Sequence, residues 1–374
     1  VTLATPEERA EFEADRAALE ARYSTVFRSV QVFDRPVIPG HMAKRRDILS
    51  HLRFHTRHGL PLMDVSYYTP EVVDAARRLV DRGAIDVIEV DHAQLAYVRR
   101  FVDDVPAILV MHNIEGDVHP FWMTSRWNLP ELLTWRAFAS VSRRNTRRVE
   151  IGNAFGFSSK LFISPLDMAR VGDECPKHLL PVPFEVTDDA RTFSRHGLRL
   201  LWLGGFDWPP NAEGMRWFLD HVWPLLESEP EIQLDVVGAH PPADIADRAD
   251  SRVRIHGFVD DISTVKARAD VLVAPLLAGS GVRVKVVEAL AAGMPVVTTP
   301  KGLEGLTAEA GRDLLVASDA EGFAAAIGRL HRSVDLRRAL GLAARDYIAS
   351  THAPEAVAPI KAAALESAVE SGPS

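Results

Sequence analysis

Residues 275–302 read PLLAGSGVRVKVVEALAAGMPVVTTPKG. An apolar segment ends at Pro275, a glycine-rich loop follows, and a second apolar segment with helical spacing covers Gly281–Ala292. A strand, a glycine-rich loop and a helix in this order predict one unit of a parallel α/β sheet. Glycine lets a backbone approach a ligand closely, and the first N–H groups of a helix have no partner within it. The stretch therefore predicts an anion site suited to a phosphate, with Ser280 as the helix N-cap.

Three charged residues, Arg283, Lys285 and Glu288, interrupt this apolar stretch. In a helix, Gly281, Lys285 and Glu288 share one face. Lys285 would bring positive charge to the anion end, and Glu288 could accept two hydrogen bonds from a diol such as a ribose. The alternative is a solvated pair of Lys285 with Glu288, which would contribute only about 0.2–0.5 kcal/mol. The charged face therefore indicates either a nucleotide site or an ordinary surface pair.

Strands and amphipathic helices alternate along the whole chain of 374 residues. Leu198–Leu203 and Ile232–Val237 are examples of the predicted strands, and this alternation predicts parallel sheets built from βαβ units. A length of 374 residues favours two domains, joined by a linker around Pro181–Gly197. We predict an N-terminal domain over residues 1–185, a C-terminal domain over residues 186–352, and a final helix over residues 353–374. Ligands of such sheets bind at the carboxyl ends of the strands, so the site is expected in a cleft where the two domains face each other.

The composition argues against several classes of protein. The formal net charge is −8, so no overall field favours nucleic acid, and we expect no nucleic-acid partner. The single cysteine, Cys175, excludes an internal disulfide framework and suits a reducing cytosol. No apolar run reaches the roughly 18 residues of a membrane helix. We expect a cytoplasmic protein, either free or peripheral at the inner face of the membrane.

The second half of the chain resembles a known family, the retaining GT-B glycosyltransferases of group 1. The matching segments are LWLGGFDWPPNAEGMRWFLDHVWPLL at residues 201–226 and VRIHGFVDDISTVKARADVLVAPLLAGSGVRVKVVEALAAGMPVVTTPKGLEGL at residues 253–306. The resemblance covers most of residues 198–350. It implies two Rossmann-like domains and a nucleotide diphosphate sugar as donor. It also implies transfer with retention of configuration, with no metal and no other cofactor.

The resemblance assigns roles to residues of the second half. Glu288 would bind the nucleotide ribose, and the loop Gly279–Gly281 would hold the diphosphate and the sugar. Ser280 stands where the family often has a glutamate, and the segment GGFDWPPN lacks the cations that many members carry there. Arg283 and Lys285 would then supply the positive charge. The expected donor-binding residues are Gly204, Gly205, Phe258, Val259, Gly279, Ser280, Gly281, Arg283, Lys285 and Glu288, of which Phe258 and Val259 would line the base pocket.

The first half resembles the acceptor domain of the same family less closely. In AILVMHNIEGD, His112 follows a predicted strand, and the resemblance implies that it contacts the donor sugar. Asp91, His92, Asn113 and Glu115 are weaker, acceptor-side candidates. The strand, glycine-rich loop and helix that open the family's N-terminal domain have no counterpart before Val1. We expect the N-terminal domain to lack this unit and the final helix to pack back on it.

We therefore expect a glycosyltransferase that moves a sugar to a hydroxyl acceptor, with His112, Lys285 and Glu288 as the catalytic candidates. The acceptor would be a glycan, a lipid-linked molecule or a small molecule. Two alternatives remain: a nucleotide-sugar epimerase of the related two-domain fold, and a nucleotide-sugar-binding protein that has lost catalysis. Basic and aromatic residues in HMAKRRDILSHLRFHTRHG and FWMTSRWNLPELLTWRAFASVSRRNTRR suit either an anionic membrane or an ordinary solvated surface.

Overall fold

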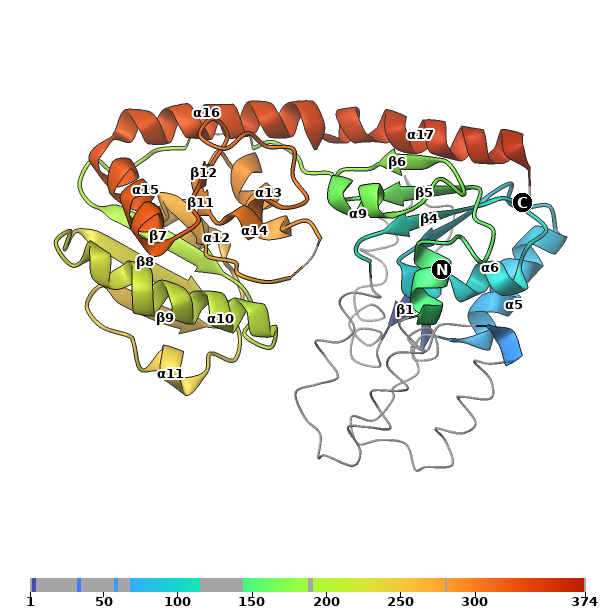
Figure 1. Cartoon of the computed structure of the whole chain (residues 1–374), viewed down its shortest axis with the longest axis horizontal. Helices are drawn as coiled ribbons and strands as arrows, with labels where there is room; N and C mark the ends of the chain where they lie inside the picture. The colour runs from blue at the N-terminus through green and yellow to red at the C-terminus, as the bar shows by residue number, and fades with distance from the viewer. Residues whose placement is uncertain are drawn as a thin grey trace. The chain divides into compact units, whose positions relative to one another are not determined.

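A computed structural model of the chain describes residues 2–4, 32–34, 57–59, 68–114, 144–187, 191–279 and 281–372. The chain divides into two compact units. The first comprises residues 1–162, 167–179 and 362–374, and the second comprises residues 163–166 and 180–361. Both units are built on parallel β-sheets, as the alternation of strands and helices predicts (Figure 1).

The second unit contains a six-stranded parallel sheet with the strand order β12-β11-β10-β7-β8-β9. Strands β7 and β10 lie side by side although seven elements, β8 and β9 among them, separate them in the chain. This is the order of a doubly wound sheet, which reverses direction between β7 and β10 and leaves a crevice at their carboxyl ends. The strands are β7 (Leu198–Leu203), β8 (Ile232–Val237), β9 (Val253–Gly257), β10 (Val271–Ala274), β11 (Val296–Thr298) and β12 (Leu315–Val316).

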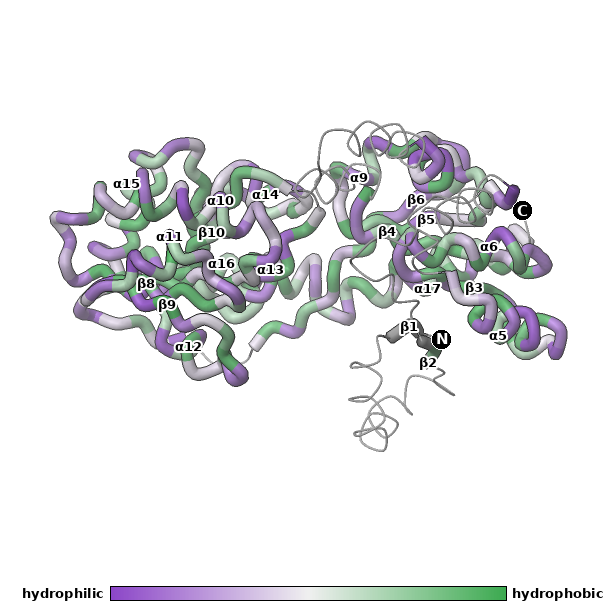
Figure 2. Tube along the Cα trace, turned by 90° about the horizontal axis from the view of Figure 1, so that it is seen from below, coloured by the Kyte–Doolittle hydropathy of each residue, from purple (hydrophilic) through white to green (hydrophobic). Residues whose placement is uncertain are grey.

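Helices cover both faces of this sheet, and two hydrophobic clusters lie between them and the strands. One cluster holds Trp202, Met215, Phe218 and Phe323, and the other holds Val286, Leu290 and Tyr347. Figure 2 shows hydrophobic residues along β8 and β10 and mixed hydropathy on the surrounding helices. The elements of this unit are α10 (Pro209–Trp217), a π-helical turn (Phe218–Val222), a 3₁₀ turn (Trp223–Leu226), α11 (Ala243–Ala246), α12 (Ser263–Arg268), α13 (Val284–Ala291), α14 (Pro300–Leu303), α15 (Ala320–Arg332) and α16 (Val334–Thr351).

The first unit contains a four-stranded parallel sheet with the order β3-β4-β5-β6. A further parallel pair joins β1 to β2, from Thr2 opposite Val32 to Ala4 opposite Asp34. The core under the larger sheet includes Tyr97, Leu109 and Phe162. The elements are β1 (Thr2–Ala4), β2 (Val32–Asp34), α5 (Pro70–Asp81), β3 (Ile88–Asp91), a 3₁₀ turn (Ala93–Leu95), α6 (Tyr97–Phe101), β4 (Ala107–Met111), β5 (Ser159–Phe162), α9 (Pro165–Arg170), β6 (Lys177–Leu179) and α17 (Pro354–Ser371), which spans the division at residue 361.

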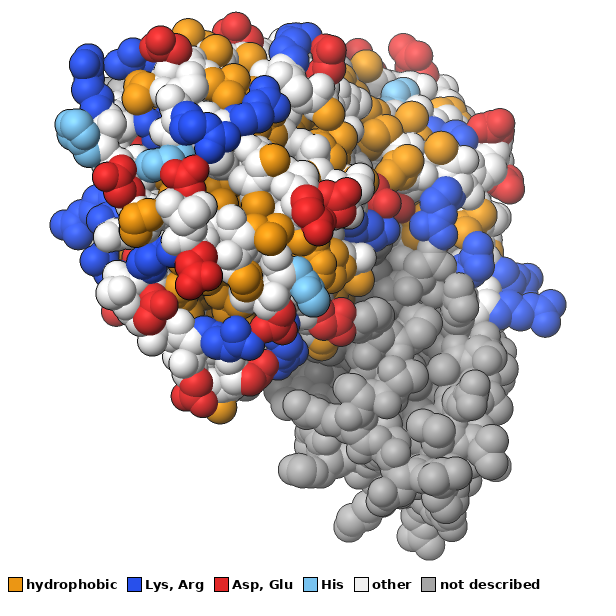
Figure 3. All heavy atoms as spheres, turned by 60° about the vertical axis from the view of Figure 1, so that its left-hand side comes forward, with side chains coloured by type: hydrophobic (Ala, Val, Ile, Leu, Met, Phe, Trp, Pro, Cys, Tyr) orange, Lys and Arg blue, Asp and Glu red, His pale blue; other side chains and the backbone are white. Residues whose placement is uncertain are grey.

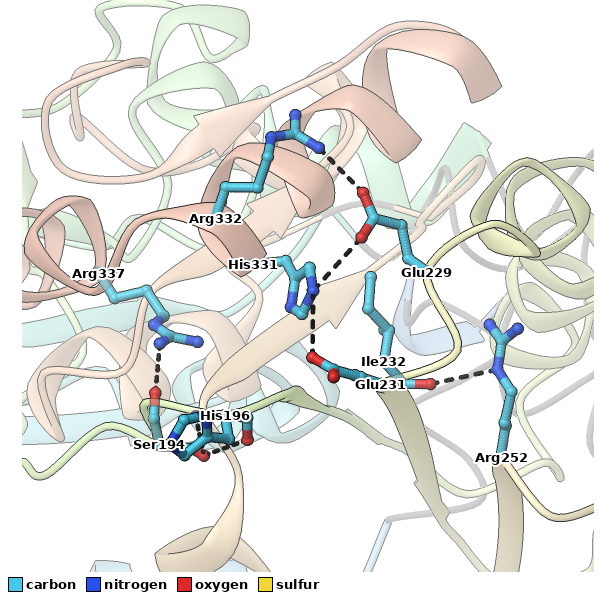
Figure 4. Close-up of polar contacts among 9 residues, drawn as sticks. All are labelled: Ser194, His196, Glu229, Glu231, Ile232, Arg252, His331, Arg332 and Arg337. Carbon is cyan, nitrogen blue, oxygen red and sulfur yellow. Dashed lines mark hydrogen bonds and ion pairs between the residues drawn. The ribbon is translucent and has the colours of Figure 1, made fainter.

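Polar contacts hold the amino-terminal edge of the six-stranded sheet (Figure 4). Glu229, just before β8, pairs with Arg332 at 3.0 Å and with His331 at 3.3 Å, both at the end of α15. The buried Arg337 of α16 donates to the carbonyl oxygen of Ser194. These contacts tie α15 and α16 to the chain that enters β7 and β8. On the outer face of this unit, charges of both signs are interspersed (Figure 3).

A cavity of about 360 Å³ opens at this same amino-terminal edge. Arg199, Gln233 and Arg268 are among its lining residues, and Arg199 donates to Gln233 at 3.1 Å. Its residues belong to the edge where β7 and β8 begin, so this cavity is separate from the carboxyl ends where ligands of doubly wound sheets bind.

The helix at the centre of the quoted stretch is shorter than the sequence predicts. We expect a helix over Gly281–Ala292 with Ser280 as its N-cap, but α13 begins at Val284 and its N-cap is Arg283. Gly279 and Gly281 have φ angles of 107° and 76°, which a right-handed helix does not allow, so the loop continues past both glycines. Ser280 itself lies outside the described residues.

Two glycines in helices provide a matched test of packing at the carboxyl edge. A Cβ on Gly214 of α10 would lie 2.1 Å from the carbonyl oxygen of Pro275, whereas a Cβ on Gly328 of α15 would meet only the flexible end of Arg332 at 3.1 Å. We expect Gly214→Ala to lower the free energy of unfolding by about 1–3 kcal/mol. Gly328→Ala should be neutral or should raise it by up to about 1 kcal/mol, since alanine favours a helix.

Urea unfolding of the two variants and the parent chain measures both changes. A Gly214→Ala variant as stable as the parent would show that α10 does not rest against the end of β10.

Candidate functional site

The carboxyl edge of the six-stranded sheet gathers residues from three loops of the second unit. Gly204 and Gly205 follow β7, Phe258 follows β9, and the loop to α13 follows β10. The ends of β7 and β10 flank the point where the strand order reverses. Such a point is where ligands of doubly wound sheets bind, so these loops form the candidate site.

Lys285, in the first turn of α13, reaches back to the end of β7. Its Nζ donates to the carbonyl oxygen of Leu203 at 2.7 Å and to Oδ1 of Asn211 at 3.1 Å. The ammonium also lies 5.0 Å from the centre of the buried Trp202 ring. The side chain therefore connects α13, β7 and α10, and it brings a cation to the GGFDWPPN segment, which has none of its own.

The surroundings of Lys285 disfavour its charged form. Burial, and to a lesser extent the positive charge of Arg283, lower the pKa of the Lys285 amine to about 7. Desolvation costs a charged amine more than a neutral one, and a nearby cation acts in the same direction. An anion bound close to Lys285 would raise this pKa, and the amine would then gain a proton.

Asn211 belongs to this site, although no pattern in the sequence points to it. Its Nδ2 donates to the carbonyl oxygen of Gly205 at 2.8 Å, while its Oδ1 accepts from Lys285. A Cβ on Gly204 would lie 2.8 Å from Asn211 and 3.1 Å from the Lys285 Nζ, so only glycine leaves these groups in place. The one available signal is a polar residue in the first turn after the GGFDWPP loop, and asparagine is common in such turns for other reasons.

The glycine-rich loop carries Arg283 beside Gly279. A Cβ on Gly279 would lie 2.9 Å from Nη1 and 3.0 Å from Nη2 of Arg283, so the guanidinium lies against the loop backbone. The expected anion loop and both expected cations, Arg283 and Lys285, therefore meet at the start of α13. Helix N-termini favour anions through their unpaired N–H groups and their dipole.

Glu288 and Lys285 do not form the surface pair that the sequence leaves open as an alternative. The Glu288 carboxylate lies 2.5 Å from the Nζ of Lys266 on α12, and its side chain is 43% exposed. Lys285 instead bonds to β7 and α10, as described above. The exposed carboxylate can accept hydrogen bonds from a ligand, in competition with Lys266.

The two expected base-pocket residues differ in exposure. Phe258 is 74% exposed directly after β9, which leaves its ring open for stacking. Val259 is half-buried and packs against the hydrophobic cluster on the α13 side of the sheet. Phe258 can therefore contact a ligand, and Val259 contributes mainly to the core.

The first unit brings together three of the expected residues. Nε2 of His112 lies 2.7 Å from Oδ1 of Asp91, and the His112 ring stacks on the His92 ring at 3.8 Å. Burial lowers the pKa of His92, and the nearby His112 lowers it further, although Asp91 opposes the shift. Asn113 is half-buried next to His112. Glu115 lies outside the described residues.

Comparisons with known proteins find a family match within the second unit. Residues 197–333 match the family model of the glycosyl transferases group 1. Within the second unit, residues 197–333 are therefore similar to the group 1 glycosyl transferases. An uncharacterized 44.6 kDa protein of the Klebsiella pneumoniae cps region is 27% identical over 206 residues, which are 51% of this chain and 52% of that protein. A phosphatidyl-myo-inositol mannosyltransferase of Mycobacterium leprae is 32% identical over 250 residues, which are 62% and 66% of the two chains.

Solved structures extend the likeness over nearly the whole chain. The sucrose-phosphate synthase of Thermosynechococcus elongatus superposes with a TM-score of 0.65 at 17% identity, and it covers 99% of this chain and 98% of its own. HepE of Anabaena, solved with UDP and glucose, gives a TM-score of 0.62 at 14% identity and covers 98% of both chains. At these identities the likeness shows the fold alone, which is the expected GT-B architecture. The chain spans about half the length of the Klebsiella relative and just under two thirds of the M. leprae one.

No helix among the described residues has the length and hydrophobicity needed to span a bilayer.

The lowered pKa of Lys285 predicts a change of stability with pH. The amine titrates near pH 7 in the folded chain and near pH 10.4 when unfolded, so between these values the unfolded chain binds more protons. The free energy of unfolding should therefore rise with pH across this window, by up to about 1.4 kcal/mol per pH unit from this residue. Below pH 7 both states are protonated and the slope disappears.

Urea unfolding between pH 6 and pH 10 (roughly the window of these two pKa values) measures the slope. The Lys285→Met variant should lose this part of it, and Lys361→Met, in α17, should keep it. Equal slopes for all three chains would rule out a lowered pKa at Lys285.

Proposed function

We propose that this protein transfers a sugar from a nucleotide diphosphate sugar to a hydroxyl group of a glycan, a lipid-linked acceptor or a small molecule. The group 1 domain over residues 197–333 and the GT-B fold support a glycosyltransferase. Two neighbours of the same fold were solved with UDP, HepE with glucose and the pneumococcal GtfA with GlcNAc, so UDP-sugars are the first donors to test. The mannosyltransferase relatives favour a lipid-linked acceptor.

The observation that carries this proposal is the position of Lys285. Its amine lies at the reversal point of the sheet, bonded to Leu203 and Asn211, beside the loop that holds Arg283. A leaving diphosphate develops negative charge as the bond to the sugar breaks. Two cations and the N–H groups at the start of α13 would stabilise that charge without further reorganisation. A bound diphosphate would also raise the pKa of Lys285, and the neutral amine would then take up a proton from solvent.

Two exposed side chains, Phe258 and Glu288, would contact the base and the ribose of the nucleotide. The open ring of Phe258 would stack on the base, as aromatic side chains do on nucleobases. The Glu288 carboxylate would accept hydrogen bonds from the two ribose hydroxyl groups and would release Lys266 when it does so. Gly204 and Gly205 would allow the phosphates to approach the end of β7.

The proposed roles in the first unit follow the resemblance. His112, which Asp91 orients through a 2.7 Å contact, would hydrogen-bond to the donor sugar. Asp91, His92 and Asn113 would contact the acceptor. We further propose that transfer retains the anomeric configuration and needs no metal, because Lys285 and Arg283 would carry out the charge stabilisation that a metal provides in other transferases.

Product analysis with isotopically labelled UDP-, GDP- and dTDP-sugars tests the reaction itself. Sugar transferred to an acceptor, or slow release of free sugar by hydrolysis, supports the proposal. Epimerised nucleotide sugar would point to an epimerase, and binding without turnover would point to a binding protein. The anomeric configuration of the product, read by NMR, and activity in the presence of a chelator test retention and metal independence.

The proposed ribose contact predicts different effects for variants of the two residues of this ion pair. Glu288→Gln should weaken the binding of UDP about tenfold to hundredfold, because a charged acceptor contributes about 1.5–3 kcal/mol to a hydrogen bond. Lys266→Met removes the same ion pair but keeps the carboxylate, so it should leave UDP binding unchanged or tighter.

Isothermal titration calorimetry measures both affinities, and circular dichroism checks that the variants fold. If Lys266→Met weakens binding as much as Glu288→Gln does, the ion pair holds α12 to α13 and the carboxylate has no role on the ribose.

The proposed diphosphate contact predicts proton uptake. At pH 8 the Lys285 amine is mainly neutral, and a bound diphosphate should raise its pKa again. Binding of UDP at pH 8 should therefore take up close to one proton, about 0.9 at most, in the parent chain. Calorimetry in buffers with different ionisation enthalpies measures this uptake. In Lys285→Met it should fall to nearly zero, and an unchanged uptake would place the titrating group elsewhere.

A further inference from the structure

Asp91, His92 and His112 form a cluster at the carboxyl edge of the sheet in the first unit. Asp91 ends β3, and β3 pairs with β4 in parallel so that Asp91 lies opposite Val110. The ladder continues one residue further, because the N–H of His92 donates to the carbonyl oxygen of Val110 at 3.1 Å. His112 follows the last residue of β4. The sheet therefore holds the backbones of all three residues in place.

The backbone of His92 departs from a regular strand in a way that completes the cluster. Successive side chains of a strand point to opposite faces of the sheet, so Asp91 and His92 should diverge. At His92 the φ and ψ angles are 76° and 134°, a conformation that non-glycine residues rarely adopt. As a result both side chains reach the same partner: Asp91 bonds to His112, and the His92 ring stacks on the His112 ring at an angle of 16°.

We propose that the Asp91–His92–His112 cluster binds a divalent transition-metal ion, with Zn²⁺ as the best match. Each residue offers one ligand atom, and these atoms all lie within 4.8 Å of one another. Two imidazoles and one carboxylate are ligands that zinc takes at about 2.0–2.2 Å, with further positions left for water. The side chains of Asp91 and His112 are 59% and 31% exposed, so an ion can reach them from solvent.

Binding requires only small movements of side chains. Ligand atoms around one zinc ion lie roughly 3.3–3.5 Å apart, as tetrahedral bonds of about 2.1 Å require. Nε2 of His112 and Oδ1 of Asp91 must therefore separate slightly from their 2.7 Å contact as the ion replaces the proton between them. The stacked rings must also turn about their χ2 angles so that both lone pairs point at the ion. Rotations of this kind leave the sheet backbone unchanged.

The proposed metal site has no role in the proposed transfer reaction. From the sequence we expect no metal, and transfer as proposed does not need one. An ion on His112 would instead occupy the group proposed to contact the donor sugar, so Zn²⁺ would inhibit transfer. The binding test below does not depend on that activity, so the metal site and the transferase proposal succeed or fail separately.

Titration of the metal-free chain with Co²⁺ tests the site, because Co²⁺ takes the same ligands as zinc and its visible absorption reports their number and kind. We expect one ion per chain, displaced by Zn²⁺. His92→Gly and Asp91→Asn should each weaken binding at least tenfold. Glycine tolerates the positive φ at position 92, and asparagine keeps the size of Asp91, so both variants should fold.

A second pair of the same kind is the matched control. His240 and Asp207, in the second unit, also lie 2.7 Å apart and are exposed. His240→Ala should leave the binding of Co²⁺ and Zn²⁺ unchanged, because this pair belongs to no group of three ligands among the described residues. The proposal is overturned if the parent chain binds no stoichiometric Co²⁺, if His92→Gly binds as tightly as the parent, or if His240→Ala weakens binding equally.

Discussion

The Nζ of Lys285 donates to the carbonyl oxygen of Leu203, so a residue that follows β10 bonds to the end of β7. These two strands are neighbours because the sheet reverses its order between them. The bond crosses the crevice that the reversal creates, and Asn211 of α10 completes it. One buried amine of α13 thus connects this helix to the end of β7 and to α10. Its cost is the desolvation that lowers the Lys285 pKa, and a bound anion would remove that cost.

Close backbone packing around this amine depends on small residues. A Cβ on Gly238 would lie 1.9 Å from the carbonyl oxygen of Gly204, and a Cβ on Gly214 would lie 2.1 Å from that of Pro275. The loop after β8 therefore approaches the loop after β7 at backbone distance, and α10 approaches the residue that follows β10 in the same way. This packing sets the position of Asn211, because α10 cannot move outward without breaking its contact with β10. The surroundings of the Lys285 amine therefore depend on glycines, because larger residues would push these backbone segments apart.

The strands predicted from the sequence agree closely with the sheet of the second unit. The predicted start of the helix α13 is wrong, and the reason is local. β7 and β8 match their predicted ranges, because both are apolar runs of strand length between turn residues. α13 begins at Val284, three residues after the expected start, because Gly279 and Gly281 adopt positive φ angles. A glycine next to a helix is equally compatible with a helix turn and with a loop, so the spacing of apolar residues cannot locate the first turn.

The sequence alone determines that this chain forms parallel α/β sheets, with a glycine-rich loop that leads into a helix carrying two cations near its start, since these features depend on residues close together in the chain. It does not determine the partners of those charges. Tertiary structure pairs Glu288 with Lys266 and Lys285 with Asn211, and it brings Asp91 and His92 to His112. Each of these contacts joins residues about 20 or more positions apart, and only the order of strands in a sheet decides which of them become neighbours.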